Sequence, residues 1–382
     1  MPRRWIVWIG ALVVGIGAGV GIAAARQSSP QPPAAFQPIP QVGNPRLDSG
    51  TPLNSVAPAF TLTDQFGKKV SLSSFRGKVV VVSFNDPLCT TICPLTTTAL
   101  LEAKKLLGPA AADVQLLGVG ANPEATQVKW VRAYSQAHGM MRKWRFLTGS
   151  LPLMKRVWSS YGILAAAVQG TIDHTPATYI IDPQGRETRL FITLMSYSSV
   201  PQLAQVLARG IAADLPGHPR VRETTSLAPI PLIGPRQHVT LPNATGGGTI
   251  RLGPGQGPHL VLFFNTWESE VSNLTAGLEM LNRYAALNSV APLVAIDEAK
   301  VESSPTALPL FLYNVPQLAY PVAIDASGRV ADGYGVQNSP WLTLVSGSGR
   351  ILWSYDVGAK GWPSMRSLVR RVHASLAPKS AP

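Results

Sequence analysis

Cysteine is nearly absent from this chain of 382 residues, which contains only two. Two thiols cannot build a disulfide-dense scaffold, a four-cysteine zinc site or an iron–sulfur cluster ligated by cysteines of one chain. The sequence also has no P-loop, GxSxG or HExxH pattern. The common motifs of nucleotide-binding proteins, serine hydrolases and zinc peptidases are therefore missing.

Charged residues are scarce as well. They make up 14% of the chain, whereas soluble domains average ~25%. Hydrophobic residues make up 46%, which is enough to build cores, and the length suggests two domains of ~100–200 residues. The 33 basic residues outnumber the 20 acidic ones, mostly in the first half of the chain. Such an excess favours an acidic protein or an anionic lipid surface as partner.

The N-terminus carries a predicted membrane anchor. An uncharged run, Trp5–Ala25, follows Arg3 and Arg4, and as a helix of ~31 Å it is long enough to cross a bilayer. The arginines place residues 1–4 in the cytoplasm and the bulk of this single-pass protein on the extracytoplasmic side of the cell membrane, which argues against nucleic acid as a partner. A signal peptide cleaved near Ala23–Ala25 is the alternative.

Two proline-rich stretches divide the rest of the chain. Residues 26–53 and 216–236 contain little that can build a core, so we interpret both as linkers. They bound two predicted domains, which cover residues 54–215 and 237–382.

The two predicted domains show signs of internal duplication. Hydrophobic strands are expected at 79–84 and again at 259–264, and a strand followed by a glycine turn is expected at 176–182 and again at 340–346. In the first half, helix and strand patterns alternate between these strands, at 95–107, 114–118 and 126–138. Such alternation predicts a mixed α/β sheet with helices on its faces.

Both cysteines lie in one short segment, Asp86–Pro94, between a buried strand and a helix. Cys89 and Cys93 are four residues apart at a helix start, so their side chains can point the same way and the helix favours the thiolate form. Three interpretations compete: a structural disulfide, a redox dithiol and a metal site. A disulfide across so short a loop gains little chain entropy, which makes stability a weak reason for it.

His174 is the candidate for a third metal ligand. It precedes a predicted strand that can bring it close to the cysteine loop. Two thiolates and one imidazole form a soft donor set that suits Cu(I), whereas structural zinc would require a fourth ligand. The neighbouring Asp173 is a candidate for orienting the imidazole.

These residues resemble the Sco/SenC family of copper-binding, thioredoxin-like proteins. The shared features are the CxxxCP loop Cys89–Pro94 after a hydrophobic strand, the distal His174, and the segments 118–124 and 144–149, and the similarity covers residues ~54–210. The resemblance implies a thioredoxin-like fold and copper ligation, as Cu(I) or Cu(II), by Cys89, Cys93 and His174. Many members have proline after the first cysteine, where this chain has Thr90.

The resemblance further implies a metallochaperone, rather than an enzyme, that supports assembly of the dinuclear copper site of cytochrome c oxidase subunit II or loads another copper-accepting membrane protein. The alternative is a thiol–disulfide oxidoreductase in which Cys89 and Cys93 cycle with a thioredoxin-like reductant; a copper or redox sensor is a third class. The loop also resembles that of peroxiredoxins, but Asp86 stands where they have threonine. Its charge is expected to raise the pKa of Cys89 and to oppose peroxidase chemistry.

The second half resembles a TlpA-like thioredoxin domain that has lost its cysteines. Trp267 precedes Glu268 and Val271 where the CxxC cysteines would stand, and Ser339–Pro340 resembles the cis-proline pair of that fold. The duplication leaves two registers: Cys89 corresponds to Ser269 or Glu268, Cys93 to Asn273 or Ser272, and His174 to Asn338. For Glu268 and Glu270 we expect a solvated helix start, with binding of a hard cation as the alternative. We favour a docking or scaffolding role for this half.

The predicted fold class is thus α/β: two tandem thioredoxin-like domains, each a mixed central sheet with helices on both faces, behind an N-terminal transmembrane helix.

Overall fold

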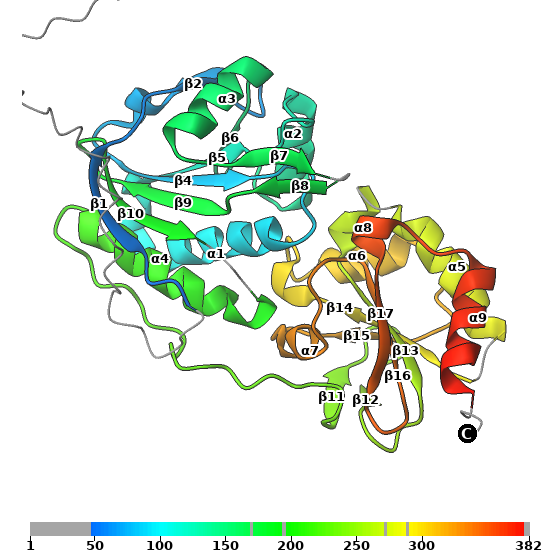
Figure 1. The fold of residues 1–382 in the computed structure, drawn as a ribbon. Helices are drawn as coiled ribbons and strands as arrows, with labels where there is room; N and C mark the ends of the chain where they lie inside the picture. The colour runs from blue at the N-terminus through cyan, green and yellow to red at the C-terminus, as the bar shows by residue number, and fades with distance from the viewer. Residues whose placement is uncertain (1–46, 169–170, 193–195, 271–272, 288–289, 378–382) are drawn as a thin grey trace, which may run out of the picture. The chain divides into compact units, whose positions relative to one another are not determined.

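The computed structural model of the chain describes residues 47–168, 171–192, 196–270, 273–287 and 290–377 (Figure 1). The predicted cytoplasmic tip, membrane anchor and most of the first linker lie outside these residues. Among the residues described, none of the helices combines the length and the apolar character needed to span a bilayer. The described residues belong to one compact unit that contains both of the sheets described below.

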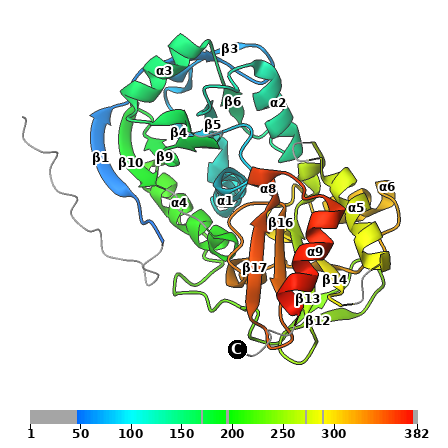
Figure 2. The same cartoon turned by 45° about the vertical axis from the view of Figure 1, so that its right-hand side comes forward.

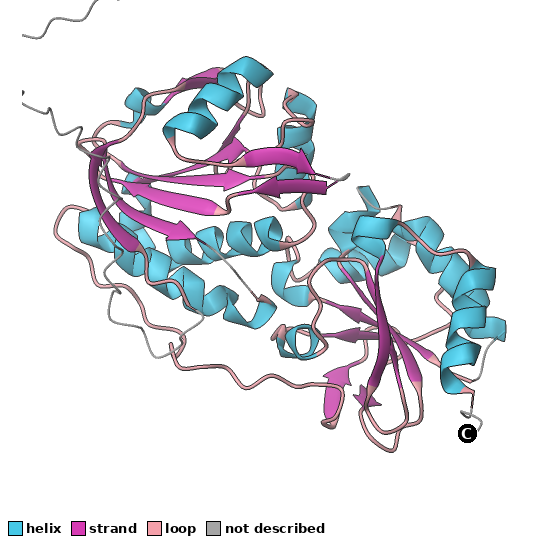
Figure 3. Cartoon of the chain, viewed as in Figure 1, coloured by secondary structure: helices cyan, strands magenta, loops and turns pink. Residues whose placement is uncertain are grey.

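The first half is built on a mixed sheet of six strands in the order β1-β10-β9-β4-β5-β6 (Figure 3). Its strands and helices are β1 Thr51–Val56, β2 Thr61–Thr63, β3 Lys69–Ser71, β4 Val79–Asn85, α1 Ile92–Leu106, β5 Val114–Gly120, α2 Val128–Ala137, β6 Arg145–Leu147, α3 Leu151–Ser160, β7 Ala165–Val168, β8 Thr171–His174, β9 Ala177–Ile181, β10 Arg186–Ile192 and α4 Val200–Asp214. Three 3-10 turns accompany them: η1 Leu72–Phe75, η2 Gly108–Asp113 and η3 Tyr197–Ser199.

The central strand β4 explains the layering of this half. All seven of its residues are buried, as expected of a strand covered on both faces. Because side chains alternate along a strand, Val79 and Val81 pack into one core with α1 and α4, while Val80 and Val82 pack into another with α3. Figures 1 and 2 show α1 and α4 on one side of the sheet and α3 on the other.

The second half contains a five-stranded sheet in the order β15-β14-β13-β16-β17, beside the hairpin β11–β12. Its elements are β11 Val239–Pro242, β12 Thr249–Leu252, β13 His259–Phe264, η4 Thr266–Glu270, α5 Leu274–Leu287, β14 Leu293–Asp297, η5 Ala299–Val301, α6 Ala307–Asn314, β15 Val322–Ile324, α7 Arg329–Gly333, β16 Trp341–Val345, β17 Ile351–Asp356, α8 Val357–Lys360 and α9 Met365–Leu376.

The two sheets share strand order and direction. The series β10-β9-β4-β5-β6 of the first sheet matches β17-β16-β13-β14-β15 of the second, with parallel and antiparallel pairs at the same places. This agreement supports the internal duplication.

The strand register also selects between the two alignments of the halves. Tyr179 pairs with Val82 in the first sheet, and its counterpart Thr343 pairs with Val261 in the second. Val82 and Val261 therefore correspond, and this register places Glu268 at the position of Cys89.

The ends of the first domain differ from the predicted ones. β1 begins at Thr51 and pairs with β10, so the folded part starts before the predicted end of the linker 26–53. Pro52 is tolerated there because β1 is the edge strand of the sheet. The predicted linker 216–236 contains no regular helix or strand, yet the amide of Thr224 donates to Gln205 of α4 at 3.0 Å.

Candidate metal centre

The three predicted ligands lie at the ends of different elements. Cys89 is in the loop after β4, Cys93 is in the first turn of α1, and His174 is the last residue of β8. The Sγ atom of Cys93 is 3.6 Å from Nε2 of His174, although 81 residues separate them in sequence. Both cysteines are free thiols; Cys93 is only 2% exposed, whereas Cys89 is half-buried.

The start of the cysteine loop is fixed by Asp86. Its Oδ1 accepts hydrogen bonds from the amide of Leu88 and from Nδ2 of Asn122, both at 2.8 Å. Asp86 and Asn122 are both buried, and Asn122 lies just beyond β5. The ends of two adjacent parallel strands therefore hold the loop together.

The two thiols are electrostatically unequal. The hydrogen bond from Cys93 lowers the pKa of Cys89 below that of an ordinary thiol, and the contact with Thr91 adds to this effect. Burial and the interaction with Cys89 raise the pKa of Cys93 well above the ordinary value. Cys89 is thus the first of the pair to become a thiolate. The amide of Thr91, just before α1, donates to its sulfur at 3.4 Å, and such donors at a helix start favour the thiolate.

The expected effect of Asp86 on Cys89 is present but does not decide the outcome. Asp86 raises the pKa of Cys89, as predicted, yet the net shift is downward because the hydrogen bond from Cys93 is the larger contribution. Burial also raises the pKa of Asp86 itself, which favours its neutral form. The predicted direction of the Asp86 effect is therefore confirmed, although Cys89 is more acidic overall than an ordinary thiol.

His174 presents one ring nitrogen to the thiols. Its Nδ1 is 3.3 Å from the carbonyl oxygen of Thr175, which leaves Nε2 facing Cys93. Burial lowers the pKa of the imidazole, so the ring is neutral near pH 7. A backbone carbonyl at Nδ1 is a common way to orient a metal-binding histidine. Thr175 takes the orienting place that was predicted for Asp173, whose side chain is exposed.

The donor atoms suit a soft metal ion. For metal–ligand bonds of ~2.3 Å to sulfur and ~2.0 Å to nitrogen, two donors on one ion lie roughly 3.6 Å apart, which matches the separation of Cys93 and His174. Within the described ranges, however, no group of three or more His, Cys, Asp or Glu side chains is arranged to hold a metal ion as it stands. Cys93 and His174 are therefore brought together, and Cys89 interacts with Cys93 without completing a three-ligand group.

The corresponding place in the second half is lined by carboxyl groups. Glu268 is fully buried, so the prediction of a solvated helix start is wrong for this residue. Burial raises its pKa to about 8, and burial likewise raises the pKa values of Asp297 and Glu298. Asn265 donates to Glu298 at 2.9 Å and to Ser339 at 3.1 Å. This half offers oxygen donors where the first half offers sulfur and nitrogen.

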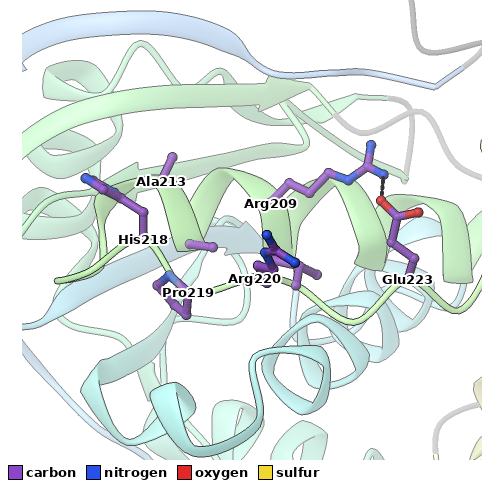
Figure 4. Close-up of a pocket in the computed structure, with 8 residues that line it drawn as sticks. Arg209, Ala213, His218, Pro219, Arg220 and Glu223 are labelled. Carbon is purple, nitrogen blue, oxygen red and sulfur yellow. Dashed lines mark hydrogen bonds and ion pairs between the residues drawn. The ribbon is translucent and has the colours of Figure 1, made fainter.

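A pocket of about 620 Å³ lies elsewhere, between α4 and the connector 216–236 (Figure 4). Arg209, His218, Arg220 and Glu223 line it, and Arg209 forms an ion pair with Glu223. None of the predicted metal ligands lines this pocket, so it is separate from the thiol chemistry.

Sequence reasoning assigned no role near the thiols to two polar residues. Asn122 supports Asp86, and Asn338 of the second half accepts a hydrogen bond from Thr90 at 2.6 Å. The available signal for Asn338 was its place directly before Ser339–Pro340, and that peptide bond is cis, as the resemblance to a cis-proline pair predicted.

Residues 49–209 match the SCO1/SenC family. A SCO1 protein homolog of Bacillus subtilis is 28% identical over 140 residues, which cover 35% of this chain and 72% of the homolog. The chloroplastic peroxiredoxin Q of Suaeda salsa is also 28% identical, over 43% of this chain and 69% of that protein.

Among solved structures, Bradyrhizobium japonicum ScoI with copper bound is 26% identical to this chain. The alignment covers 36% of this chain and 89% of ScoI, with a TM-score of 0.33. The SCO1/SenC match and the mixed sheet agree with the thioredoxin-like fold expected for the first half. The TlpA-like assignment of the second half stays a prediction.

Proposed function

We propose that this protein is a membrane-tethered, extracytoplasmic copper chaperone that binds copper through Cys89, Cys93 and His174. The observation that carries the proposal is the 3.6 Å approach of the Cys93 sulfur to Nε2 of His174, beside a second free thiol. Thiolates select Cu(I), and neutral imidazole is a suitable third ligand. The copper ion is cargo that the site receives and releases.

The unequal burial of the ligands suggests how the cargo leaves. Cys93 and His174 form the inner pair, and Cys89, half-buried and more acidic, lies on the accessible side of the loop. For all three to ligate one ion, the Cys89 sulfur exchanges its contacts with Thr91 for the metal beside Cys93. A thiolate or imidazole of an acceptor protein can then displace Cys89 first, which keeps copper ligated throughout the transfer.

The acceptor and the location follow from the family resemblance and the N-terminal sequence. We propose the dinuclear copper site of cytochrome c oxidase subunit II, or another copper-accepting membrane protein, as the acceptor. Residues 5–25 would tether the chain to the cell membrane, with the ligands on the extracytoplasmic side.

The test is an anaerobic Cu(I) titration of the reduced full chain in detergent against a competing chelator. Cys89→Ser, Cys93→Ser and His174→Ala are measured beside the parent, with His238→Ala as the matched control because His238 is exposed and distant in sequence. We expect one tight copper per chain in the parent and control, weakened in all three site variants. Absence of tight copper in the parent contradicts the proposal.

The second candidate is a thiol–disulfide oxidoreductase, which the asymmetry of the two thiols favours. An acidic, half-buried Cys89 can attack a target disulfide, and Cys93 can then resolve the mixed disulfide. The target gains two electrons and two protons, and the Cys89–Cys93 disulfide is re-reduced by a thioredoxin-like dithiol. Under this function His174→Ala leaves the reduction of a disulfide substrate intact, whereas either cysteine variant abolishes turnover.

A further inference from the structure

The loop that carries the cysteines is hydrogen-bonded to the second half of the chain. The hydroxyl of Thr90 donates to Oδ1 of Asn338 at 2.6 Å, and Asn338 is only 8% exposed. Thr90 lies between Cys89 and Thr91, and the hydroxyl and amide of Thr91 lie 3.1 and 3.4 Å from the Cys89 sulfur. A contact at Thr90 therefore acts on the residues that set the position of Cys89.

Asn338 is held firmly in its place. Its Oδ1 also accepts from the amide of Ser339 at 2.9 Å, and its Nδ2 donates to Asp356 at 3.0 Å. Asp356 in turn caps α8 by accepting from the amide of Ala359. A Cβ on Gly358 would lie 2.7 Å from Nδ2 of Asn338, so the backbone of α8 packs directly against the amide. These contacts hold the Oδ1 atom of Asn338 in the orientation that accepts the hydrogen bond from Thr90.

Other contacts join the second half to the helices of the first. The Nζ of Lys300 is 3.8 Å from the Glu102 carboxylate on α1, the helix that carries Cys93. The amides of Tyr197 and Ser198 donate to Asp332 at 2.9 and 2.8 Å. Asn338 is therefore one of several contacts, and the only one of these that reaches the cysteine loop.

We propose that Asn338 is a positioning residue: through Thr90 it holds the Cys89–Cys93 loop in the conformation of the two free thiols. The bond stabilises the reduced loop relative to its disulfide form and to looser conformations. A single hydrogen bond of this kind shifts such an equilibrium about fivefold. The consequence for copper affinity rests on the proposed function, whereas the consequence for the thiols does not.

The experiment measures the thiol equilibrium of the full chain in glutathione buffers. Glutathione disulfide accepts the two electrons of the Cys89–Cys93 pair and becomes two glutathione thiols, so the ratio of the two protein forms gives an equilibrium constant. Thr90→Val removes only the donor, Asn338→Leu removes the acceptor, and the double variant closes a mutant cycle. Thr90→Ser retains the hydroxyl, and Lys300→Met breaks a contact between the halves away from the loop.

We expect Thr90→Val and Asn338→Leu each to shift the equilibrium about fivefold toward the disulfide, or about 20 mV, with no further shift in the double variant. Thr90→Ser and Lys300→Met should match the parent. Equal constants in all variants, or additive shifts in the double variant, overturn the proposal. Cu(I) titration of the same variants is the second readout: a thiol shift without any copper binding would reject the chaperone and retain the positioning role.

Discussion

The two sheets of this protein have the same strand order, but the loops at matching positions carry different side chains. After β4 the chain provides two thiols, with an imidazole 3.6 Å from one of them. After β13 it provides a buried Glu268, and Asn338 stands where the first half has His174. The comparison shows that one backbone arrangement can support a soft-metal or redox site and also a site that is confined to oxygen and amide groups.

The two halves also differ in what they contact. In the first half, Thr90 follows the first cysteine, at a position where many members of the Sco/SenC family have proline. In the second half, Asn338, the counterpart of the candidate metal ligand His174, accepts the Thr90 hydrogen bond. The thiol-bearing loop of the first half and the second half, which has no cysteine, thus meet in one contact.

The largest expected effect comes from removing a proposed copper ligand of the first half, compared with removing a carboxylate of the second half. Cys93→Ser should weaken Cu(I) binding by more than about 100-fold, since even the loss of residues that only orient ligands costs 10–100-fold. Glu268→Gln should leave copper affinity unchanged, because Glu268 is not one of the three proposed ligands. Chelator competition measures the Cu(I) affinity of both variants. Weaker Cu(I) binding by Glu268→Gln would contradict the prediction that the second half takes no part in copper binding.

Copper affinity should also depend steeply on pH. Copper binding requires both thiols to lose their protons, and the pKa of Cys93 is raised well above the ordinary value. The apparent affinity for Cu(I) should therefore rise by at least about tenfold per pH unit below the pKa of Cys93, and more steeply below the pKa of Cys89. The lowered pKa of His174 keeps the imidazole neutral in this range. Titrations at several pH values test this, and a flat profile would remove Cys93 from the ligand set.

The contribution of Glu268 to the free energy of unfolding should fall as pH rises, whereas the affinity for copper should rise. The pKa of Glu268 is raised to about 8 in the folded chain. Between about pH 4.5 and 8 the folded state therefore holds a proton that the unfolded state has lost, and the stabilisation present at low pH disappears as pH rises. The slope for this group is up to about 1.4 kcal/mol per pH unit.

Glu268→Gln should remove that slope, because glutamine stays neutral throughout. Denaturant unfolding at pH 5, 6.5 and 8 compares the variant with the parent. The same pH dependence in both proteins would show that Glu268 does not titrate in this range.

The smallest expected effect concerns the ion pair between Lys300 and Glu102. Its two side chains are partly exposed and 3.8 Å apart, and pairs of this kind contribute about 0–1 kcal/mol. Lys300→Met should lower the free energy of unfolding by less than about 1 kcal/mol and should leave the thiol equilibrium unchanged. A larger loss would mean that the association of the two halves depends on this pair.

Sequence alone predicted much of the architecture because the signals are local. The uninterrupted hydrophobic run of β4 indicated a central strand, and the strand predicted at 259–264 is β13. The predicted helix 126–138 corresponds to α2, Val128–Ala137. β1 was missed, because a strand that contains Pro52 and lies at a sheet edge has no clear hydrophobic pattern.

The residues of the candidate site were determined by the sequence, but their arrangement was not. With only two cysteines, the thiol chemistry had to be at Cys89 and Cys93, and His174 was selected by its place before a strand. Only the folded chain brings His174 to Cys93, lowers the pKa of one thiol while raising that of the other, and buries Glu268 instead of exposing it. The contact of Thr90 with Asn338 spans 248 residues, and no local pattern encodes it, because it depends on how two separately patterned halves pack together.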